Sequence, residues 1–264
     1  MQSLRVRSCY HFASHTDTHA IMCINFRPPS PDLLEAVLGV LVELYQDKDA
    51  DWNWPAETWK DYPAPIIRAT ADGARQACLA TYGMVPRKMI PPGVKPFDTM
   101  NARAETVGER RSFSGAWRKA QLCAVPMTCF YEPGYESGKA ERFAIGMHDD
   151  AVFNVAGLWR EWAGADGAVA TSFTQLTINA DDHALMSRFH KPGEEKRALV
   201  VIPDQDLDAW LHCRDPELAR SFLRPYPADG MKAWLAPAPP RAKKARVAEP
   251  APTLEPVPVS GNLF

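Results

Sequence analysis

The order of apolar and polar residues divides the chain into three regions. Residues 1–21 are polar and show no clear periodicity. Residues 22–235 alternate apolar runs with turn-forming residues, which is the pattern of a folded domain. From Ala236 onward the chain is rich in proline and poor in large apolar residues, a composition typical of a disordered tail with polyproline II character. We therefore expect one domain over 22–235, between an N-terminal extension and a tail over 236–264.

Helix signals are few. Ser30-Pro31-Asp32 places a capping residue, a proline and an acid in succession, which predicts a helix start. Apolar residues at helical spacing continue this helix to about Tyr45. Two short helices near 204–212 and 216–223 are predicted to close the domain.

Most other apolar runs are predicted to be strands, because they are short and bounded by turn signals. Many strands with few intervening helices indicate an α+β fold, a single domain on an antiparallel, barrel-like β-sheet core with a few peripheral helices. They do not indicate a doubly wound parallel sheet. The predicted strands lie at 65–70, 77–83, 121–131, 141–147, 152–162, 171–179 and 198–202.

Composition narrows the class of protein. The chain has 264 residues and a formal net charge of −2, so its overall charge gives no reason to expect a nucleic-acid partner. No apolar run is long enough to span a bilayer, and the N-terminus lacks a signal-peptide stretch, so we expect a cytoplasmic protein without a membrane partner. The six cysteines include no CxxC pair and no zinc-site spacing, so most are expected to be free, buried thiols.

The dipeptide Met22-Cys23 is the first candidate for chemistry. If Met22 is the initiator, its removal leaves Cys23 with a free α-amine beside its thiol. Both groups are usable nucleophiles near neutral pH, because their ordinary pKa values are about 8 and 8.5. An aldehyde condenses with the amine to an imine, and the thiol then closes a thiazolidine ring. Taken alone, the dipeptide is better explained by a buried cysteine in the first strand.

Further segments change that balance. They are Asn101–Thr106 (NARAET), Phe130-Tyr131-Glu132, Ala156–Trp159 (AGLW) and Met186–Pro192, which contains His190. Each has an ordinary explanation alone: a helix start, a strand-end carboxylate or a loop histidine. Together, in this order and spacing, they resemble the SRAP family (SOS-response-associated peptidase, also called abasic-site processing proteins), whose members begin Met-Cys-Gly-Arg-Phe. The resemblance runs from Met22 to about Leu211.

The resemblance implies a covalent function. Proteins of this family bind single-stranded DNA and join an N-terminal cysteine to the aldehyde of an abasic site, which protects the site in the DNA damage response. By this resemblance Cys23 is the nucleophile, Asn101 orients it, and Glu132 is a general acid/base. His190 then assists opening of the deoxyribose, and Arg103 holds a phosphate. No metal or organic cofactor is required, and we expect a monomer.

Local charge is consistent with a DNA partner. Residues 87–119 hold eight basic and three acidic residues, a formal charge of +5 around NARAET. A charge run is usually only a solvated face, but its place beside the candidate site favours a track for the DNA backbone. The family also carries an arginine after its histidine, and Arg197 corresponds to it by the resemblance. The expected DNA contacts are therefore Arg87, Lys88, Arg103, Arg110, Arg111 and Arg197.

Three departures from the family pattern bear on these roles. With residues 1–21 attached, the Cys23 nitrogen is an amide, so either translation starts at Met22 or the extension is removed. The family's Gly-Arg after the cysteine is Ile24-Asn25 here, which removes an arginine. An insertion separates His190 from Arg197, and His183 is the alternative catalytic histidine.

The tail offers possible binding segments, and two other functions of the chain are also considered. Arg241, Lys243, Lys244 and Arg246 form a basic patch, and Asn262-Leu263-Phe264 resembles the Leu-Phe end of peptides that bind the bacterial sliding clamp. An uninvolved tail end is the simpler interpretation. A cysteine autopeptidase or thiol hydrolase is an alternative function, and so is a noncatalytic binder of single-stranded or modified DNA.

Overall fold

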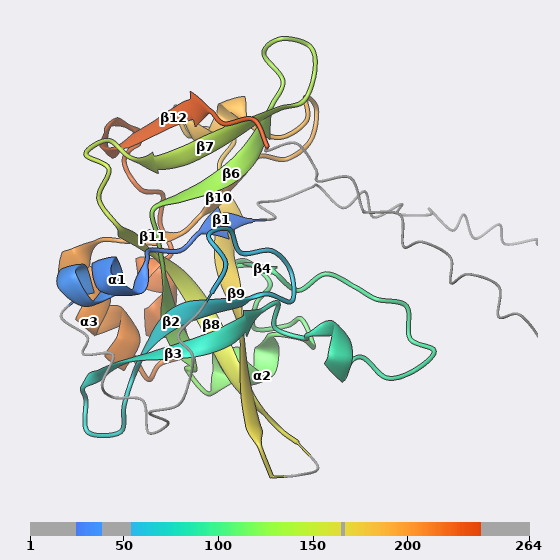
Figure 1. Cartoon of the computed structure of the whole chain (residues 1–264), viewed down its shortest axis with the longest axis vertical. Coiled ribbons are helices and arrows are strands. Elements are labelled where there is room, and N and C mark those ends of the chain that lie inside the picture. The colour runs from blue at the N-terminus through green and yellow to red at the C-terminus, as the bar shows by residue number, and fades with distance from the viewer. Residues whose placement is uncertain (1–24, 39–53, 165–166, 239–264) are drawn as a thin grey trace, which may run out of the picture.

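The computed structural model describes residues 25–38, 54–164 and 167–238. Figure 1 shows two β-sheets, the larger in the lower part of the view and the smaller above it, with short helices at the periphery. Cys23, the helix prediction beyond residue 38, the basic patch of the tail and the terminal Asn262-Leu263-Phe264 lie outside the described residues. Among the residues described, no helix is long and apolar enough to cross a membrane.

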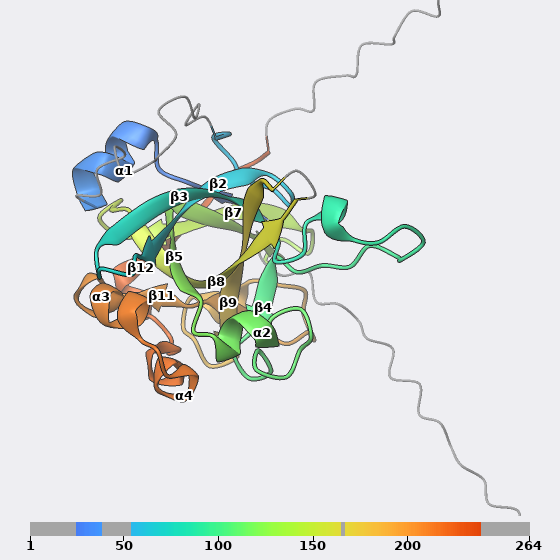
Figure 2. The ribbon, with the colours of Figure 1, turned by 90° about the horizontal axis from the view of Figure 1, so that it is seen from below.

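The larger sheet closes on itself as a barrel, as Figure 2 shows from below. Its strands pair in the order β9-β3-β2-β5-β8, and a further pairing of β8 with β9 completes the ring. The fold prediction is therefore confirmed, although β9 runs parallel to β3 and β4. The five strands are β2 (Pro63–Ala69), β3 (Arg75–Tyr82), β5 (Leu122–Met127), β8 (Phe153–Ala163) and β9 (Val169–Asn179).

Three short strands extend the barrel sheet beyond the ring. β4 (Asn101–Arg103) and β10 (Arg197–Leu199) both pair with the end of β9, and β11 (Val201–Ile202) pairs with β8. The single strand predicted at 198–202 is thus divided at Val200. Its N–H donates to the carbonyl of Leu176, and its own carbonyl accepts from the N–H of Ala156.

The smaller sheet is antiparallel, in the order β1-β6-β7-β12. Its strands are β1 (Phe26–Arg27), β6 (Cys129–Gly134), β7 (Glu141–Met147) and β12 (Met231–Leu235). The strand predicted at 121–131 is wrong as one unit, because the chain leaves the barrel at Thr128 and enters this sheet as β6. Nearly every residue on both sides of Thr128 is buried, so alternation of polar and apolar positions gives no sign of the corner.

The helices are short and lie outside the barrel (Figure 1). α1 (Pro31–Leu38) begins where predicted, and α3 (Asp204–His212) matches its predicted range. The helix predicted at 216–223 is α4 (Pro216–Ala219) followed by a 3₁₀ turn. α2 (Ser114–Arg118) was not predicted, because five residues are too few to show helical periodicity. The 3₁₀ turns are η2 (Arg87–Met89), η3 (Met186–Arg188), η4 (Arg220–Phe222) and η5 (Ala228–Gly230).

Two apolar cores hold the sheets in place. One fills the barrel and continues to the smaller sheet, with Tyr82 stacked on Phe173 at 5.2 Å between ring centroids. The other lies between the outer barrel face and α2 and α3, where Trp210 donates from Nε1 to the Cys123 carbonyl over 2.9 Å. The four cysteines described, Cys78, Cys123, Cys129 and Cys213, are free and buried as predicted.

Gly157 of the AGLW segment is required by this packing. A Cβ atom built there would lie 2.8 Å from the Thr174 carbonyl oxygen and 2.9 Å from the Cys123 Sγ. Contacts that short force neighbouring backbone to move. The glycine of this motif therefore serves the closure of the barrel between β8 and β9.

Gly157→Ala is expected to lower the free energy of unfolding by about 1–3 kcal/mol, because the added methyl overpacks the barrel. Urea denaturation measures the change. Gly115→Ala is the matched control, since a Cβ at this helical position meets nothing within 4 Å. It is expected to leave stability unchanged or raise it by up to about 1 kcal/mol. Equal stability of the two variants would contradict this role for Gly157.

Candidate functional site

Glu132 and His190 form a buried pair. Glu132 lies in β6 and His190 follows η3, and each residue is almost wholly excluded from solvent. Nδ1 of His190 lies 3.6 Å from Oε2 of Glu132. The backbone makes this approach possible, because the N–H of His190 donates to the carbonyl of Pro133 over 3.0 Å, and Phe189 forms a β-bridge with Gly134.

The surroundings of His190 determine which ring nitrogen carries a proton. Nε2 lies 2.9 Å from the backbone carbonyl of Arg197. A carbonyl oxygen only accepts hydrogen bonds, so Nε2 is protonated and donates. In the neutral imidazole Nδ1 is then unprotonated and faces the carboxyl of Glu132. A carboxyl and an imidazole are side chains that can act in general acid–base chemistry, and here they face each other away from solvent.

His190 adopts a left-handed backbone conformation, with φ of +65°. This costs roughly 1–2 kcal/mol for a non-glycine residue and persists only when neighbouring groups enforce it. Lys196 does so, because its Nζ donates to the carbonyls of His190 and Lys191, each over 3.0 Å. The inserted segment after His190 is therefore tied back on the histidine.

The alternative histidine has a structural role. Nδ1 of His183 accepts from the N–H groups of Leu185 and Met186, and Nε2 lies 2.8 Å from the carbonyl of Tyr226. Both ring nitrogens are thus engaged with backbone, in a segment that leads into η3. His190, and not His183, faces a carboxyl.

The NARAET segment is a strand followed by a turn. β4 runs parallel to β9, with Asn101 opposite Gln175 and Arg103 opposite Thr177. Successive side chains of a strand point to opposite faces, so Asn101 and Arg103 share one face while the buried Ala102 points to the other. β4 thus brings the predicted amide and the predicted phosphate contact to the same side.

Four charged residues join NARAET to the segment after His190. The buried guanidinium of Arg197 donates to both oxygens of Glu105, over 2.9 and 2.8 Å, and to the carbonyl of Thr177 over 2.8 Å. It also donates to Oε1 of Glu195 over 2.8 Å, while Arg103 donates to Oε2 of Glu195 over 2.6 Å. We call Arg103, Glu105, Glu195 and Arg197 the arginine–glutamate cluster.

The cluster defines the surroundings of Arg197. Its side chain is only 2% exposed, and its guanidinium is held by two carboxylates in the DNA-free chain. The expected contact of Arg197 with a DNA phosphate stays a prediction. Burial raises the pKa of Glu105 and Glu195, but the hydrogen bonds and charges of the arginines outweigh it and hold both pKa values below the usual range.

The described chain begins beside Glu132. The N–H of Tyr131 donates to the carbonyl of Asn25 over 3.2 Å, and Nδ2 of Asn25 donates to Glu57 over 3.0 Å. Arg142 donates to the same Glu57 oxygen over 2.7 Å and lies over the Tyr131 ring, 3.4 Å from its centroid. Glu57 and Arg142 belong to no sequence motif, so the sequence did not predict this anchor. Only their partial burial and their hydrogen bonds in the folded chain reveal it.

The predicted basic track is exposed. Figure 1 shows the segment between β3 and β4, including η2, projecting from the barrel. Arg87, Lys88, Arg110 and Arg111 are exposed, and none forms an ion pair with another described residue. Their charges are therefore available to solvent.

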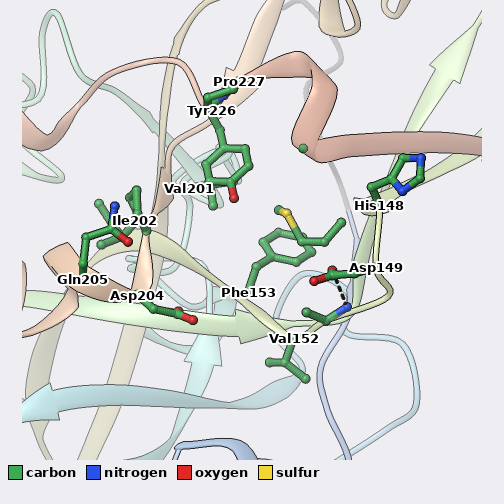
Figure 3. Close-up of a pocket in the computed structure, with 14 residues that line it drawn as sticks. His148, Asp149, Val152, Phe153, Val201, Ile202, Asp204, Gln205, Tyr226 and Pro227 are labelled. Atoms are coloured by element: carbon green, nitrogen blue, oxygen red, sulfur yellow. Dashed lines mark hydrogen bonds between the residues drawn. The ribbon is translucent and has the colours of Figure 1, made fainter.

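A cavity of about 490 Å³ lies elsewhere on the molecule. Figure 3 shows its lining, which includes Phe153, Tyr226 and the carboxyls of Asp149 and Asp204. None of the predicted site residues contributes to it. The candidate chemistry therefore does not use this cavity.

The sequence and fold are similar to those of known proteins. The sequence model of a family described as SOS response associated peptidase (SRAP) matches residues 9–260. The chain belongs to the SRAP family.

Curated relatives of this SRAP chain carry similar names. It is 31% identical over 156 residues to the abasic site processing proteins YobE and YoqW of Bacillus subtilis strain 168. Each match covers 55% of this chain, and 66% and 65% of the two relatives. The match thus spans just under two thirds of their length.

Solved structures share the SRAP chain's fold. A crystal structure of a Bordetella bronchiseptica protein has a TM-score of 0.69 and 33% identity, covering 82% of this chain and 100% of that one. A Bacteroides thetaiotaomicron protein has a TM-score of 0.63 at 20% identity, covering 81% of this chain and 91% of that one. The second likeness concerns the fold alone.

Arg197→Met is expected to destabilise the SRAP domain by about 1–3 kcal/mol, because the buried guanidinium no longer donates to Glu105, Glu195 and the carbonyl of Thr177. Thermal or urea unfolding measures the loss. Arg188→Met is the control, because Arg188 pairs with Glu136 where both side chains are about half exposed. Such a surface pair contributes less than about 1 kcal/mol. Similar losses in both variants would refute a central structural role for Arg197.

Acid is expected to weaken the cluster. Because the folded-state pKa values of Glu105 and Glu195 lie below the usual range, the stability they provide is complete above about pH 4.3 and falls as pH drops through the folded values. Glu105→Gln should therefore lower stability at pH 7 and flatten the loss between pH 7 and pH 3. Urea midpoints across this range measure it. Glu217→Gln is the charge-matched control, and an acid slope for Glu105→Gln as steep as that of the wild type would argue against the effect.

Proposed function

We propose that this protein binds single-stranded DNA and joins Cys23, once its α-amine is free, to the aldehyde of an abasic site as a thiazolidine. The adduct would protect the site during the DNA damage response. The observation that carries the proposal is the buried Glu132–His190 pair, in which the carboxyl and the imidazole face each other at 3.6 Å beside the start of β1. Membership of the SRAP family and the names of the Bacillus relatives point to the same substrate.

Chain connectivity supports Cys23 as the nucleophile. Two residues of extended chain span at most about 7 Å, and Cys23 stands two residues before Asn25. The carbonyl of Asn25 accepts from Tyr131, the residue before Glu132. This short connection supports a nucleophile at position 23 acting with Glu132 and His190.

The proposed reaction balances without an added reactant. Opening of the deoxyribose moves the proton of its anomeric hydroxyl, by way of His190, to the ring oxygen and gives the aldehyde. The Cys23 α-amine attacks the carbonyl carbon. Glu132 delivers a proton to the departing hydroxyl and takes one from the amine nitrogen, so that water leaves and an imine forms. The Cys23 sulfur then adds to the imine carbon, and its proton passes to the nitrogen. One C–N and one C–S bond replace the carbonyl, and one water is released.

The remaining residues bind and orient. Asn101 holds the cysteine through its side-chain amide, and Arg103, on the same face of β4, contacts a phosphate. The exposed Arg87, Lys88, Arg110 and Arg111 extend the electrostatic attraction along the DNA backbone. Arg197 acts as a positioning residue, because its carbonyl fixes the tautomer of His190.

The test uses protein that begins at Cys23 and an oligonucleotide with one abasic site. We expect an adduct stable to heat and detergent, lost in Cys23→Ala. Glu132→Gln should slow its formation by about 10²-fold or more, since general acid–base groups contribute roughly 10²–10⁴ in rate. His190→Asn should also slow it, because asparagine tolerates the left-handed backbone but cannot shuttle the proton. Glu136→Gln, an exposed carboxyl two residues beyond β6, is the matched control with the wild-type rate.

Other outcomes identify the alternatives. Absence of any adduct from folded protein, or equal adduct with Cys23→Ala, rejects the crosslinking mechanism. Salt-sensitive binding that ignores the aldehyde and Cys23 indicates a noncatalytic DNA binder. Loss of residues 1–21 from the full-length chain, blocked by Cys23→Ala and seen by intact mass, indicates an autopeptidase.

A further inference from the structure

The carboxylate of Glu195 bridges two guanidinium groups. Its Oε1 accepts from Arg197 over 2.8 Å, and its Oε2 accepts from Arg103 over 2.6 Å. Two oxygens of one anion, each receiving a guanidinium N–H, is also the arrangement in which arginines hold a phosphodiester group. The arginine–glutamate cluster thus contains an anion site that the protein's own carboxylate fills.

The two glutamates of the cluster are held very differently. Glu105 makes a two-point contact with Arg197 and also accepts from the N–H of Asn179. Glu195 makes one short contact with each arginine and a long one, 3.4 Å, with the Asn179 amide. It stands in the segment after His190. Both carboxylates reach solvent, with the Glu195 side chain 33% and the Glu105 side chain 49% exposed, so the difference between them lies in their contacts. Glu105 is therefore the permanent partner of Arg197, and Glu195 is the exchangeable one.

Because of charge balance, Glu195 can leave the two arginines favourably only if another anion takes its place. Two arginines and two glutamates leave the cluster neutral, so withdrawal of Glu195 alone would leave one positive charge uncompensated. The pKa of Glu195 is held below the usual range despite partial burial, so this carboxyl stays ionised at neutral pH. Exchange therefore proceeds by competition for the arginines and not by protonation of the carboxyl.

We propose that Glu195 occupies, in the DNA-free protein, the place of a backbone phosphate at Arg103, and that a phosphodiester group of single-stranded DNA displaces it. Arg103 shares a face of β4 with Asn101, so this phosphate site lies on the side of the candidate nucleophile. Internal competition lowers nonspecific affinity, because each DNA strand must first replace Glu195. The inference rests on the proposed function only in taking single-stranded DNA as the ligand.

The test measures noncovalent binding of the full-length chain to an unmodified single-stranded oligonucleotide across a range of salt concentrations. Glu195→Gln removes the competing charge and keeps the shape. We expect it to tighten binding about five- to tenfold at low salt. The dependence of log K on log salt should steepen by about 0.7, the single-strand value for one contact, because the phosphate at Arg103 no longer replaces an existing ion pair. Glu194→Gln is the matched control, since it removes the same charge from the neighbouring position of the same turn. It should tighten binding no more than about twofold and leave the slope unchanged.

Two further variants make the test specific. In an Arg103→Gln background, Glu195→Gln should no longer tighten binding beyond the effect of Glu194→Gln, because the phosphate site itself is gone. The inference is overturned if Glu195→Gln binds like Glu194→Gln, binds more weakly than the wild type, or keeps its full gain without Arg103. Normal adduct formation alongside any of these results would leave the proposed function standing. No binding of single-stranded DNA by any variant at low salt would overturn both.

Discussion

The buried guanidinium of Arg197 is the interaction on which the candidate site depends. A charge removed from water must be paired, and here the partners come from separate parts of the chain: Glu105 from NARAET, Glu195 from the turn after His190, and the carbonyl of Thr177 from β9. The backbone carbonyl of the same arginine accepts a hydrogen bond from Nε2 of His190. One residue therefore ties the strand that carries Asn101 and Arg103 to the histidine that faces Glu132.

Strand β9 makes this meeting possible. It closes the barrel with β3 and β8, and beyond that closure it pairs with β4 and β10. Thr177 lies opposite both Arg103 and Leu199, so two segments far apart in sequence reach the same level of one strand. The rigid ring supports a histidine in a left-handed conformation, and the cost of that conformation is met by hydrogen bonds from Lys196 and to Pro133.

The residues of the candidate site differ in their exposure to solvent. Glu132 and His190 are buried. Arg87, Lys88, Arg110 and Arg111 are exposed, where charge is screened by salt. The arginine–glutamate cluster is intermediate in exposure, with Arg197 buried and Arg103 partly open to solvent. The proposed function uses this difference, with the exposed charges attracting the DNA and the buried pair excluded from bulk water.

Sequence by itself determined the elements whose cause is local. The barrel strands β2, β3, β8 and β9, and β7 of the smaller sheet, lie within two residues of their predicted ranges, because turn residues and apolar runs mark them directly. The Pro31 start of α1 and the full extent of α3 follow from the same kind of signal. The order of NARAET, AGLW and the His190 segment by itself also indicates the SRAP family.

Only the tertiary structure decided what depends on distant partners. The corner at Thr128 joins two runs that are buried on both faces, so no alternation announces it. Arg197 gives no sign of burial in sequence, and its guanidinium is enclosed by Glu105 and Thr177 only in the folded chain. That His190 faces Glu132 while His183 binds backbone is likewise visible only in the fold. The anchor of Glu57 with Asn25 and Arg142 depends on hydrogen bonds across 32 and 85 positions of sequence. Side-chain identity sets what a residue can bind, but only the folded chain sets which partner reaches it first.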